Sequence, residues 1–197
     1  MPVMPAVESR FCRSAPWRSF ARRVVLPWAL NGLEPHGQLL ELGGGSGAMA
    51  EVTAREYPVL QLTVTDIDPA MVRVAQRRLS GRPNVTVTEA DMTDLPFEDG
   101  AFDLVVTYLM LHHVIEWSAA LTESARVLRP GGILLGYDLT DTRLAQLVHW
   151  ADRSPHKLIT PVDLGRALEG VGFDHVHVDL GLGRHVMRFA AHLPRTP

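Results

Sequence analysis

The apolar residues of this chain follow two patterns that alternate along the sequence. Short apolar runs of strand length lie at residues 38–42, 60–65, 85–88, 102–107 and 133–137. Apolar residues at helical spacing lie before and between these runs, at residues 18–30, 48–57, 69–79 and 117–128. The patterns therefore predict alternating helices and strands. Because this order needs crossover connections, we expect an α/β fold with a mainly parallel sheet and helices on both faces.

Local signals define several helix ends. The first helix is expected to end at Asn31-Gly32. Its buried face is expected to include Phe20, Val24, Leu26 and Trp28. Asp68-Pro69 has the pattern of an N-cap followed by a proline at the first helical position. The helix at 117–128 is expected to stop before the segment 129–132, and a strand is expected to start at Ile133.

The last third of the chain has a different pattern. Residues 160–163 (Thr-Pro-Val-Asp) form a capping box with proline at the first helical position. Apolar and polar residues then alternate over 176–180, a turn follows at 181–183, and residues 185–192 can return as an antiparallel strand. We predict a single-domain Rossmann-like fold: a doubly wound, mainly parallel seven-stranded sheet with an antiparallel C-terminal hairpin strand.

Composition narrows the class of protein. The 197 residues are 46% hydrophobic and 21% charged, which suits one domain with a substantial core. A net charge of -3 argues against binding nucleic acid through the overall field, so we expect small-molecule partners. No apolar run is long enough to span a bilayer, and the single cysteine, Cys12, fits a reducing compartment. We expect a cytoplasmic protein, since prolines interrupt the arginine-rich start that a transit peptide would need.

A glycine loop carries the first chemical signal. Gly43, Gly45 and Gly47 follow the strand at 38–42 and precede a helix, which is the order of a nucleotide-binding βαβ unit. Glycine is favoured where a chain turns sharply or where a ligand approaches the backbone. The same residues satisfy a relaxed dinucleotide fingerprint with Asp66 as the ribose acid, so an NAD-dependent oxidoreductase remains open at this point. A tight turn without a ligand is the purely structural alternative.

Four stretches in order resemble the class I S-adenosylmethionine-dependent methyltransferases, especially the small-molecule branch of ubiquinone and menaquinone biosynthesis. The stretches are residues 41–47, 66–71, 90–97 with Phe102-Asp103, and 126–132. The similarity extends over about residues 39–173. A nicotinamide dehydrogenase does not need the last three stretches together. The resemblance therefore implies that the cofactor is S-adenosyl-L-methionine.

The resemblance also implies a role for each matching residue. Gly43, Gly45 and Gly47 would admit the methionine and ribose portions of the cofactor. Glu41 would fix the loop and reach the methionine ammonium, and the Thr107 carbonyl would complete the ammonium site.

Other matching residues would hold the nucleoside. Asp66 would accept hydrogen bonds from both ribose hydroxyls, and Asp91 would accept one from the adenine amino group. Ile67 and Met92 would sandwich the adenine, with the Met92 amide facing a ring nitrogen. Carboxylates suit these donors because they act only as acceptors and form charge-assisted bonds. In the structural alternatives, Asp66 caps a turn and Asp91 is a solvated loop acid.

A methyl transfer needs alignment of the acceptor, and a general base helps when the acceptor must lose a proton. The residues past the fourth and fifth strands supply the candidates: Tyr108, His112, His113, Tyr137 and Asp138. The resemblance leaves a packing role open for the two histidines. We expect no metal site, because the sequence has no paired ligand motif of the usual spacing.

The acceptor site is expected in segments outside the cofactor motifs, because acceptor pockets are assembled from loops. The N-terminal arm and residues 140–160 are the candidate segments, and the second has an apolar stripe formed by Leu144, Leu147, Val148 and Trp150. We divide the chain into an N-terminal arm and helix at 1–36 and a cofactor-binding methyltransferase domain at 37–197. The sequence predicts methyl transfer to a small organic acceptor, with a catalytically silent cofactor-binding partner or sensor protein as the alternative. It predicts no oligomeric state.

Overall fold

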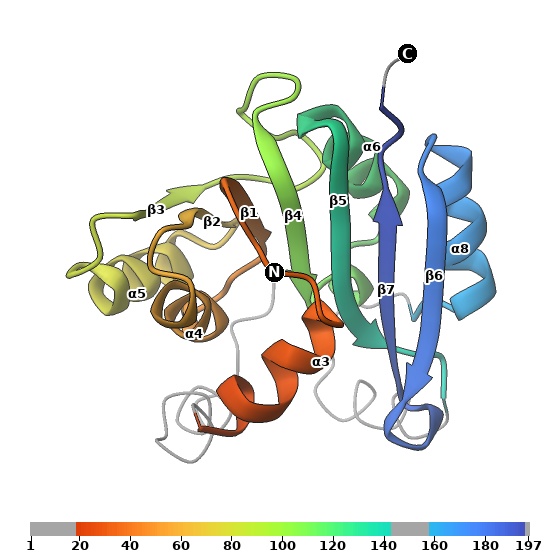
Figure 1. The fold of residues 1–197 in the computed structure, drawn as a ribbon, viewed down its shortest axis with the longest axis horizontal. Coiled ribbons are helices and arrows are strands. Elements are labelled where there is room, and N and C mark those ends of the chain that lie inside the picture. The colour runs from red at the N-terminus through yellow and green to blue at the C-terminus, as the bar shows by residue number, and fades with distance from the viewer. Residues whose placement is uncertain (1–18, 143–157, 196–197) are drawn as a thin grey trace.

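The computed structural model describes residues 19–142 and 158–195, and its strands form a seven-stranded sheet (Figure 1). Across the sheet the order is β3-β2-β1-β4-β5-β7-β6. The strands are β1 (Gln38–Leu42), β2 (Gln61–Asp66), β3 (Val85–Glu89), β4 (Phe102–Tyr108), β5 (Leu128–Leu139), β6 (Asp174–Gly181) and β7 (Val186–His192). β1 to β5 pair in parallel, whereas β7 is antiparallel to β5 and β6. The predicted fold is confirmed.

Helices cover both faces of the sheet (Figure 1). One face carries α3 (Leu26–Leu30), α4 (Ala48–Glu56) and α5 (Pro69–Leu79), and the other carries α6 (Trp117–Val127) and α8 (Pro161–Gly170). A hydrophobic core lies on each face of the sheet, and successive residues of a strand point into opposite cores. Leu39 belongs to the core under α3 and α4, and Leu40 belongs to the core under α6 and α8. The central strands are largely apolar because both of their faces are buried.

The N-terminal helix buries only part of the face that was predicted: Leu26 is buried and Trp28 packs partly buried against the core, as expected, but Phe20 and Val24 do not. Phe20 and Val24 are 47% and 49% exposed. The buried residues are Ala21, Val25, Leu26, Ala29 and Leu30. The helix includes a π-helical segment, η1 (Ala21–Val25), in which the Leu26 amide donates to the Ala21 carbonyl just before Pro27. The buried residues recur every four residues and so share one face of the helix, and Phe20 and Val24 lie beside that face. The predicted end at Asn31 is confirmed, with a φ of 50°.

The junction of α6 and β5 also differs from the prediction. The helix ends at Val127, and β5 begins at once with Leu128, which pairs with Phe102. Pairing with β4 resumes between Ile133 and Leu104, so the segment between them bulges out of register. The strand is nevertheless held on its other side, because the Gly131 amide donates to the Leu193 carbonyl at 2.9 Å. Pro and Gly in this segment mark a bulge, not the gap between helix and strand that we predicted.

Two local predictions are confirmed. The Asp68 side chain accepts from the Ala70 amide and caps α5, and the Thr160 hydroxyl accepts from the Asp163 amide and caps α8. The predicted apolar stripe at 144–150 and Cys12 lie outside the described residues. Within the described part of the chain, no helix is both long enough and apolar enough to cross a bilayer.

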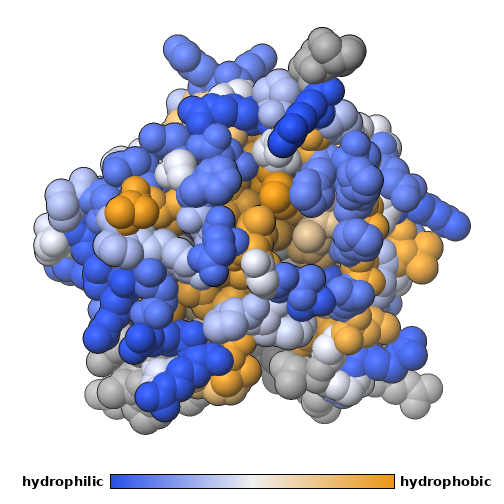
Figure 2. Space-filling model, in the orientation of Figure 1, coloured by the Kyte–Doolittle hydropathy of each residue, from blue (hydrophilic) through white to orange (hydrophobic). Residues whose placement is uncertain are grey.

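The helical part of the first 36 residues shares its core with the rest of the chain. Ala21, Val25 and Leu26 belong to the same buried cluster as Leu39 and α4. Figure 2 shows the surface of the molecule from the side that carries α3. Apolar side chains gather in the middle of this surface, among mostly hydrophilic ones.

Candidate active site

The carboxyl ends of the parallel strands meet at one edge of the sheet, where ligands bind in folds of this kind. The glycine loop lies at this edge, directly after β1. Gly43, Gly45 and Gly47 have φ values of 64°, 54° and 74°, a left-handed conformation that residues with a Cβ atom adopt at a cost. The three glycines are therefore required by the course of the backbone.

Atoms of the protein itself also press against this loop. A Cβ atom on Gly43 would lie 2.2 Å from Cγ of Met110, and one on Gly47 would lie 3.2 Å from Cβ of Ala75. The glycines need no ligand to explain them. Met110, which follows the end of β4, thus covers the loop, and the sequence analysis did not name it.

Glu41 is buried beneath the loop. Its side chain is 2% exposed, and its Oε2 atom has no hydrogen-bond partner among the described residues. Burial raises the pKa of this carboxyl to about 8. The Tyr108 hydroxyl on the neighbouring strand is also buried without a partner. A buried acceptor without a partner is costly, and it marks a place where a donor or a cation would be stabilised.

Asp66 is fastened to the same loop. Its Oδ2 atom accepts from the Gly45 amide at 2.8 Å and its Oδ1 atom accepts from the Asp68 amide at 2.9 Å. Burial raises the pKa of Asp66, although these backbone hydrogen bonds oppose that shift. Each carboxylate oxygen can accept more than one hydrogen bond, so Asp66 keeps the capacity to accept from a ligand.

Asp91 follows the end of β3 and is exposed. Its Oδ1 atom accepts from the amide and the hydroxyl of Thr93, at 2.8 and 2.7 Å. Next to it, Met92 is buried and its Cε atom comes within 3.2 Å of where a Cβ of Gly43 would lie. Ile67 is 37% exposed at the end of β2. The predicted nucleoside residues thus lie around the strand ends, with Asp91 in a turn of its own.

The five base candidates divide between the two faces of the sheet. Tyr108 and Tyr137 pack ring to ring under α3, with centroids 5.3 Å apart, and Tyr137 also contacts Trp28. His112, in the short helix η2 (Leu111–His113), contacts Asp138 at the end of β5. The structure therefore joins two of the five candidates into one hydrogen-bonded pair.

The His112–Asp138 pair is almost completely buried, with side chains 3% and 1% exposed. Nδ1 of His112 contacts Oδ1 of Asp138, and the His112 amide donates to Oδ2 at 3.2 Å. The Leu139 amide donates to Oδ1 at 2.6 Å. A carboxylate accepts only, so it keeps the ring proton on Nδ1 and leaves Nε2 as the basic nitrogen. His113 stacks on His112 with ring centroids 4.0 Å apart.

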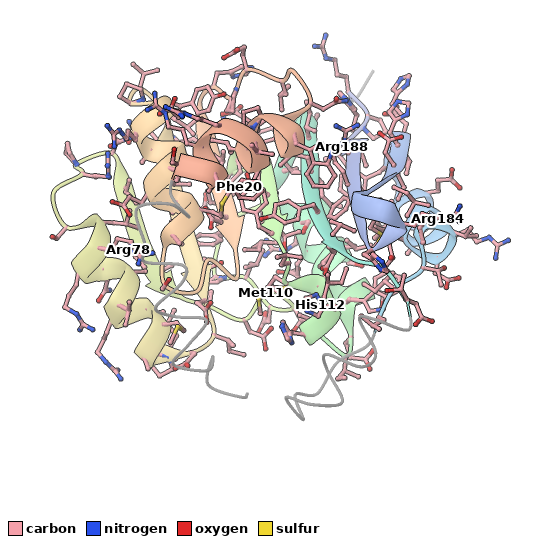
Figure 3. The ribbon with its side chains drawn as sticks, turned by 90° about the horizontal axis from the view of Figure 1, so that it is seen from below. Phe20, Arg78, Met110, His112, Arg184 and Arg188 are labelled. Carbon is pink, nitrogen blue, oxygen red and sulfur yellow. The ribbon has the colours of Figure 1, made fainter. Side chains whose placement is uncertain are left out.

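Backbone strain lies beside this pair. Leu109 has a φ of 53°, a conformation that is rare for a branched side chain, and its amide donates to the Tyr137 carbonyl at 2.8 Å. Such strain concentrates at functional sites. Figure 3 shows Met110 and His112 close to one another at the edge that follows β4.

Thr107, near the end of β4, has a buried hydroxyl without a partner among the described residues. Its carbonyl oxygen lies so close to Gly136 of β5 that a Cβ atom there would be 2.1 Å away. Within the described residues, no three His, Cys, Asp or Glu side chains are grouped to hold a metal ion.

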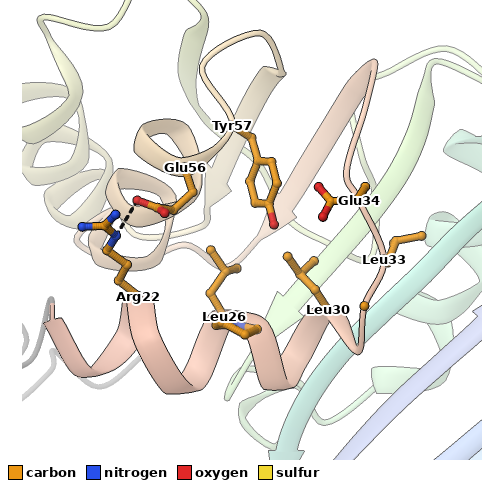
Figure 4. Close-up of a pocket in the computed structure, with 9 residues that line it drawn as sticks. Arg22, Leu26, Leu30, Leu33, Glu34, Glu56 and Tyr57 are labelled. Atoms are coloured by element: carbon orange, nitrogen blue, oxygen red, sulfur yellow. Dashed lines mark ion pairs between the residues drawn. The ribbon is translucent and has the colours of Figure 1, made fainter.

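A groove of about 170 Å³ lies elsewhere, between α3 and the end of α4 (Figure 4). Leu26, Leu30 and Leu33 line it, and an ion pair of 2.7 Å between Arg22 and Glu56 borders it. None of the predicted site residues is among its lining residues.

The sequence is similar to that of known proteins. Residues 40–136 match a family described as a methyltransferase domain. The ubiquinone/menaquinone biosynthesis C-methyltransferase UbiE of Cupriavidus taiwanensis is 38% identical over 103 residues, which are 51% of this chain and 42% of that protein. The demethylmenaquinone methyltransferase of Clavibacter sepedonicus is 35% identical over 116 residues, 59% of this chain and 44% of that protein. The chain therefore matches less than half the length of these relatives.

Solved structures share the fold at low identity. Haemonchus contortus phosphoethanolamine N-methyltransferase 2, in complex with S-adenosyl-L-methionine, superposes with a TM-score of 0.74 at 18% identity, over 88% of this chain and 52% of that one. The [4+2]-cyclase SpnF superposes with a TM-score of 0.79 at 19% identity, over 94% of this chain and 85% of that one. These likenesses concern the fold. With the family match over residues 40–136 they confirm the resemblance to methyltransferases that the four stretches indicate.

Proposed function

We propose that this protein transfers a methyl group from S-adenosyl-L-methionine to a small organic acceptor. The observation that supports the proposal best is the position of two buried carboxylates against one glycine loop. Asp66 accepts from the Gly45 amide, and Glu41, with one oxygen unpartnered, lies beneath Gly44. An ammonium and a pair of hydroxyls would satisfy such acceptors.

The residues present fit the cofactor part by part. Glu41 and the Thr107 carbonyl would hold the ammonium, and Asp66 would hold the ribose hydroxyls. Asp91 would accept from the adenine amine, and the exposed Ile67 would cover one face of the ring and Met92 the other. When bound, the sulfonium supplies an electrophilic methyl group. The glycines Gly43, Gly45 and Gly47 would keep the loop low enough for the ligand to lie over it.

Two measurements distinguish the proposed methyltransferase from the alternative functions: which cofactor the protein binds, and whether it methylates an acceptor. The fold alone does not decide, since a [4+2]-cyclase shares it. A catalytically silent partner or sensor would bind the cofactor and methylate no acceptor. A nicotinamide oxidoreductase would bind NAD in preference to S-adenosylmethionine.

We also propose that residues 37–197 form the cofactor-binding domain and that residues 1–36 act as an arm and helix at the acceptor side. We further propose that the protein works in the cytoplasm.

Asp66→Ala should abolish binding of S-adenosylhomocysteine. The variant loses charge-assisted hydrogen bonds to the ribose, which we expect to weaken affinity by about 100-fold or more. Asp66→Asn, which keeps an acceptor for the Gly45 amide, should also bind weakly. Titration calorimetry measures both effects.

The control is Asp68→Ala, two residues away. It removes the N-cap of α5, where Asp68 accepts from the Ala70 amide at 2.7 Å, so it should cost about 1 kcal/mol of stability and leave the affinity unchanged. If folded wild-type protein binds neither S-adenosylmethionine nor S-adenosylhomocysteine, the proposed function is wrong.

We further propose that His112 acts as a general base and that Asp138 orients it. Nε2 would take the proton that a hydroxyl or a carbon acid must lose, and would pass it to water afterwards. His112→Gln should lower kcat by about 10²- to 10⁴-fold on such an acceptor and remove the fall in kcat that protonation of the base causes on the acidic side of the pH profile.

Cofactor affinity should stay unchanged in His112→Gln, and His177→Gln, at an exposed position of β6, serves as the control. Transfer of labelled methyl groups to a panel of phenols, quinols, thiols and amines provides the assay. A His112→Gln variant with unchanged kcat and an unchanged pH profile on a phenol or quinol would show that the pair only packs.

A further inference from the structure

The turn that carries Asp91 and Met92 is fixed at both of its ends. On one side the Ala90 amide donates to the Asp66 carbonyl at 3.0 Å, which ties the turn to β2. On the other side the Leu95 amide donates to Oε2 of Glu123 in α6 at 2.8 Å. Between these points the Asp94 amide donates to the Asp91 carbonyl at 3.1 Å. The position of the turn therefore depends on a carboxylate from a distant helix.

Arg126 holds that carboxylate and the chain that follows the turn. Its Nε and Nη2 atoms donate to the two oxygens of Glu123 at 2.8 and 2.7 Å, in a bidentate pair. Nη2 also donates to the Leu95 carbonyl at 2.9 Å, and Nη1 donates to the Phe97 carbonyl at 2.7 Å. A further bond of 2.8 Å joins Nη1 to Asp99. One guanidinium thus organises a loop that has no helix or strand of its own.

We propose that Arg126 and Glu123 are positioning residues for cofactor binding, and that they act by fixing the turn of Asp91 and Met92 at the cofactor edge. The inference rests on the proposed function, because it takes the adenine to lie against that turn. The half-buried pair, 30% and 16% exposed, is geometrically specific because only a planar guanidinium can satisfy a carboxylate and two carbonyls together. A lysine at this position keeps the positive charge but lacks the planar set of N–H donors that the guanidinium offers.

The chain offers a matched control three residues further on. Arg129 pairs with Asp103 at 2.6 Å and donates to the Gly100 and Ala101 carbonyls, both at 3.1 Å. Its contacts are of the same kind, but they hold the start of β4, at the edge of the sheet opposite the glycine loop. Loss of either arginine should therefore reduce stability, and only the loss of Arg126 should disturb the turn.

The test compares Arg126→Lys and Arg129→Lys in the full chain, at a temperature where both remain folded. Titration with S-adenosylhomocysteine should show an affinity about tenfold or more weaker in Arg126→Lys, and an affinity close to wild type in Arg129→Lys. Hydrogen exchange without any ligand should be faster at the amides of residues 93–95 in Arg126→Lys alone. Adding Asp91→Ala to Arg126→Lys should cost less affinity than Asp91→Ala does in the wild type, because both changes act on one turn.

The outcomes separate the two proposals. Wild-type protein that does not bind the ligand overturns the proposed function, and the exchange measurement still tests the coupling of Arg126 to the turn. Normal exchange at residues 93–95 in Arg126→Lys, or equal loss of affinity in both lysine variants, overturns the positioning role. Additive losses in the double variant overturn it as well.

Discussion

Glu41→Gln is expected to stabilise the ligand-free protein at pH 8 and to change it little near pH 5. Burial raises the pKa of Glu41 from 4.5 to about 8, so the folded protein keeps a proton there that the unfolded chain has lost. The folded state binds more protons between these two values, and the free energy of unfolding therefore falls as the pH rises through this window. The slope is about 1.4 kcal/mol per pH unit, so the total is on the order of 5 kcal/mol. Glutamine has no proton to lose and escapes this penalty.

The groups that face Glu41 are consistent with a raised pKa for its carboxyl. Tyr108 of β4 and Tyr137 of β5 lie on the same side of the sheet, and Tyr57 follows α4. Burial raises the pKa of Tyr108, and the Glu41 charge raises it further. No ion pair of Glu41 with a basic side chain occurs among the described residues. Chemical denaturation at several pH values, compared with the exposed Glu98→Gln variant, measures the effect. A difference between Glu41→Gln and wild type that does not grow with pH would contradict it.

The same variant should bind S-adenosylhomocysteine about 10- to 100-fold more weakly, because the ammonium loses a charged partner. In wild type the affinity should rise as the pH approaches 8, since the bound cation favours the ionised carboxyl. Calorimetry in buffers of different ionisation enthalpy should detect the proton released on binding. Stability and affinity thus move in opposite directions at Glu41, which is typical of a residue kept for function.

Gly136→Ala is the second change with a large expected effect, here on folding. The new Cβ atom would lie 2.1 Å from the Thr107 carbonyl oxygen and 2.9 Å from the ring of Phe189. The first contact is with backbone in the centre of the sheet, where β4 and β5 pair. Neither strand can move without disturbing its other neighbour, so we expect a loss of about 3 kcal/mol or more in the free energy of unfolding.

The matched control is Gly165→Ala in α8. No atom lies within 4 Å of a Cβ placed there, and alanine favours a helix by roughly 0.5–1 kcal/mol over glycine. Thermal or urea denaturation should therefore move the two variants in opposite directions. Equal stability of Gly136→Ala and wild type would contradict the close approach of β4 and β5.

Much of the fold follows from local sequence. β1 has the bounds 38–42 that the apolar run predicts, and the caps at Asp68 and Thr160 are formed by the residues predicted for them. These features depend on neighbours within a few residues. The errors occur where local rules compete. In the N-terminal helix Ala21 and Val25 take the buried positions that the prediction assigned to Phe20 and Val24, and near Gly131 hydrogen bonds to Leu193, distant in sequence, hold β5 through residues that otherwise end an element.

In the candidate site, too, some features follow from the sequence and others only from the tertiary structure. The sequence by itself determined the glycine loop, the acids Glu41, Asp66 and Asp91, and the order of strands that brings them to one edge, because these depend on residue type and spacing along the chain. Only the tertiary structure decided that Met110 covers Gly43, that His112 pairs with Asp138, and that Arg126 holds the loop after Met92. Each of these contacts joins segments far apart in sequence. Their geometry depends on how strands and helices pack, and no periodicity within one segment encodes that packing.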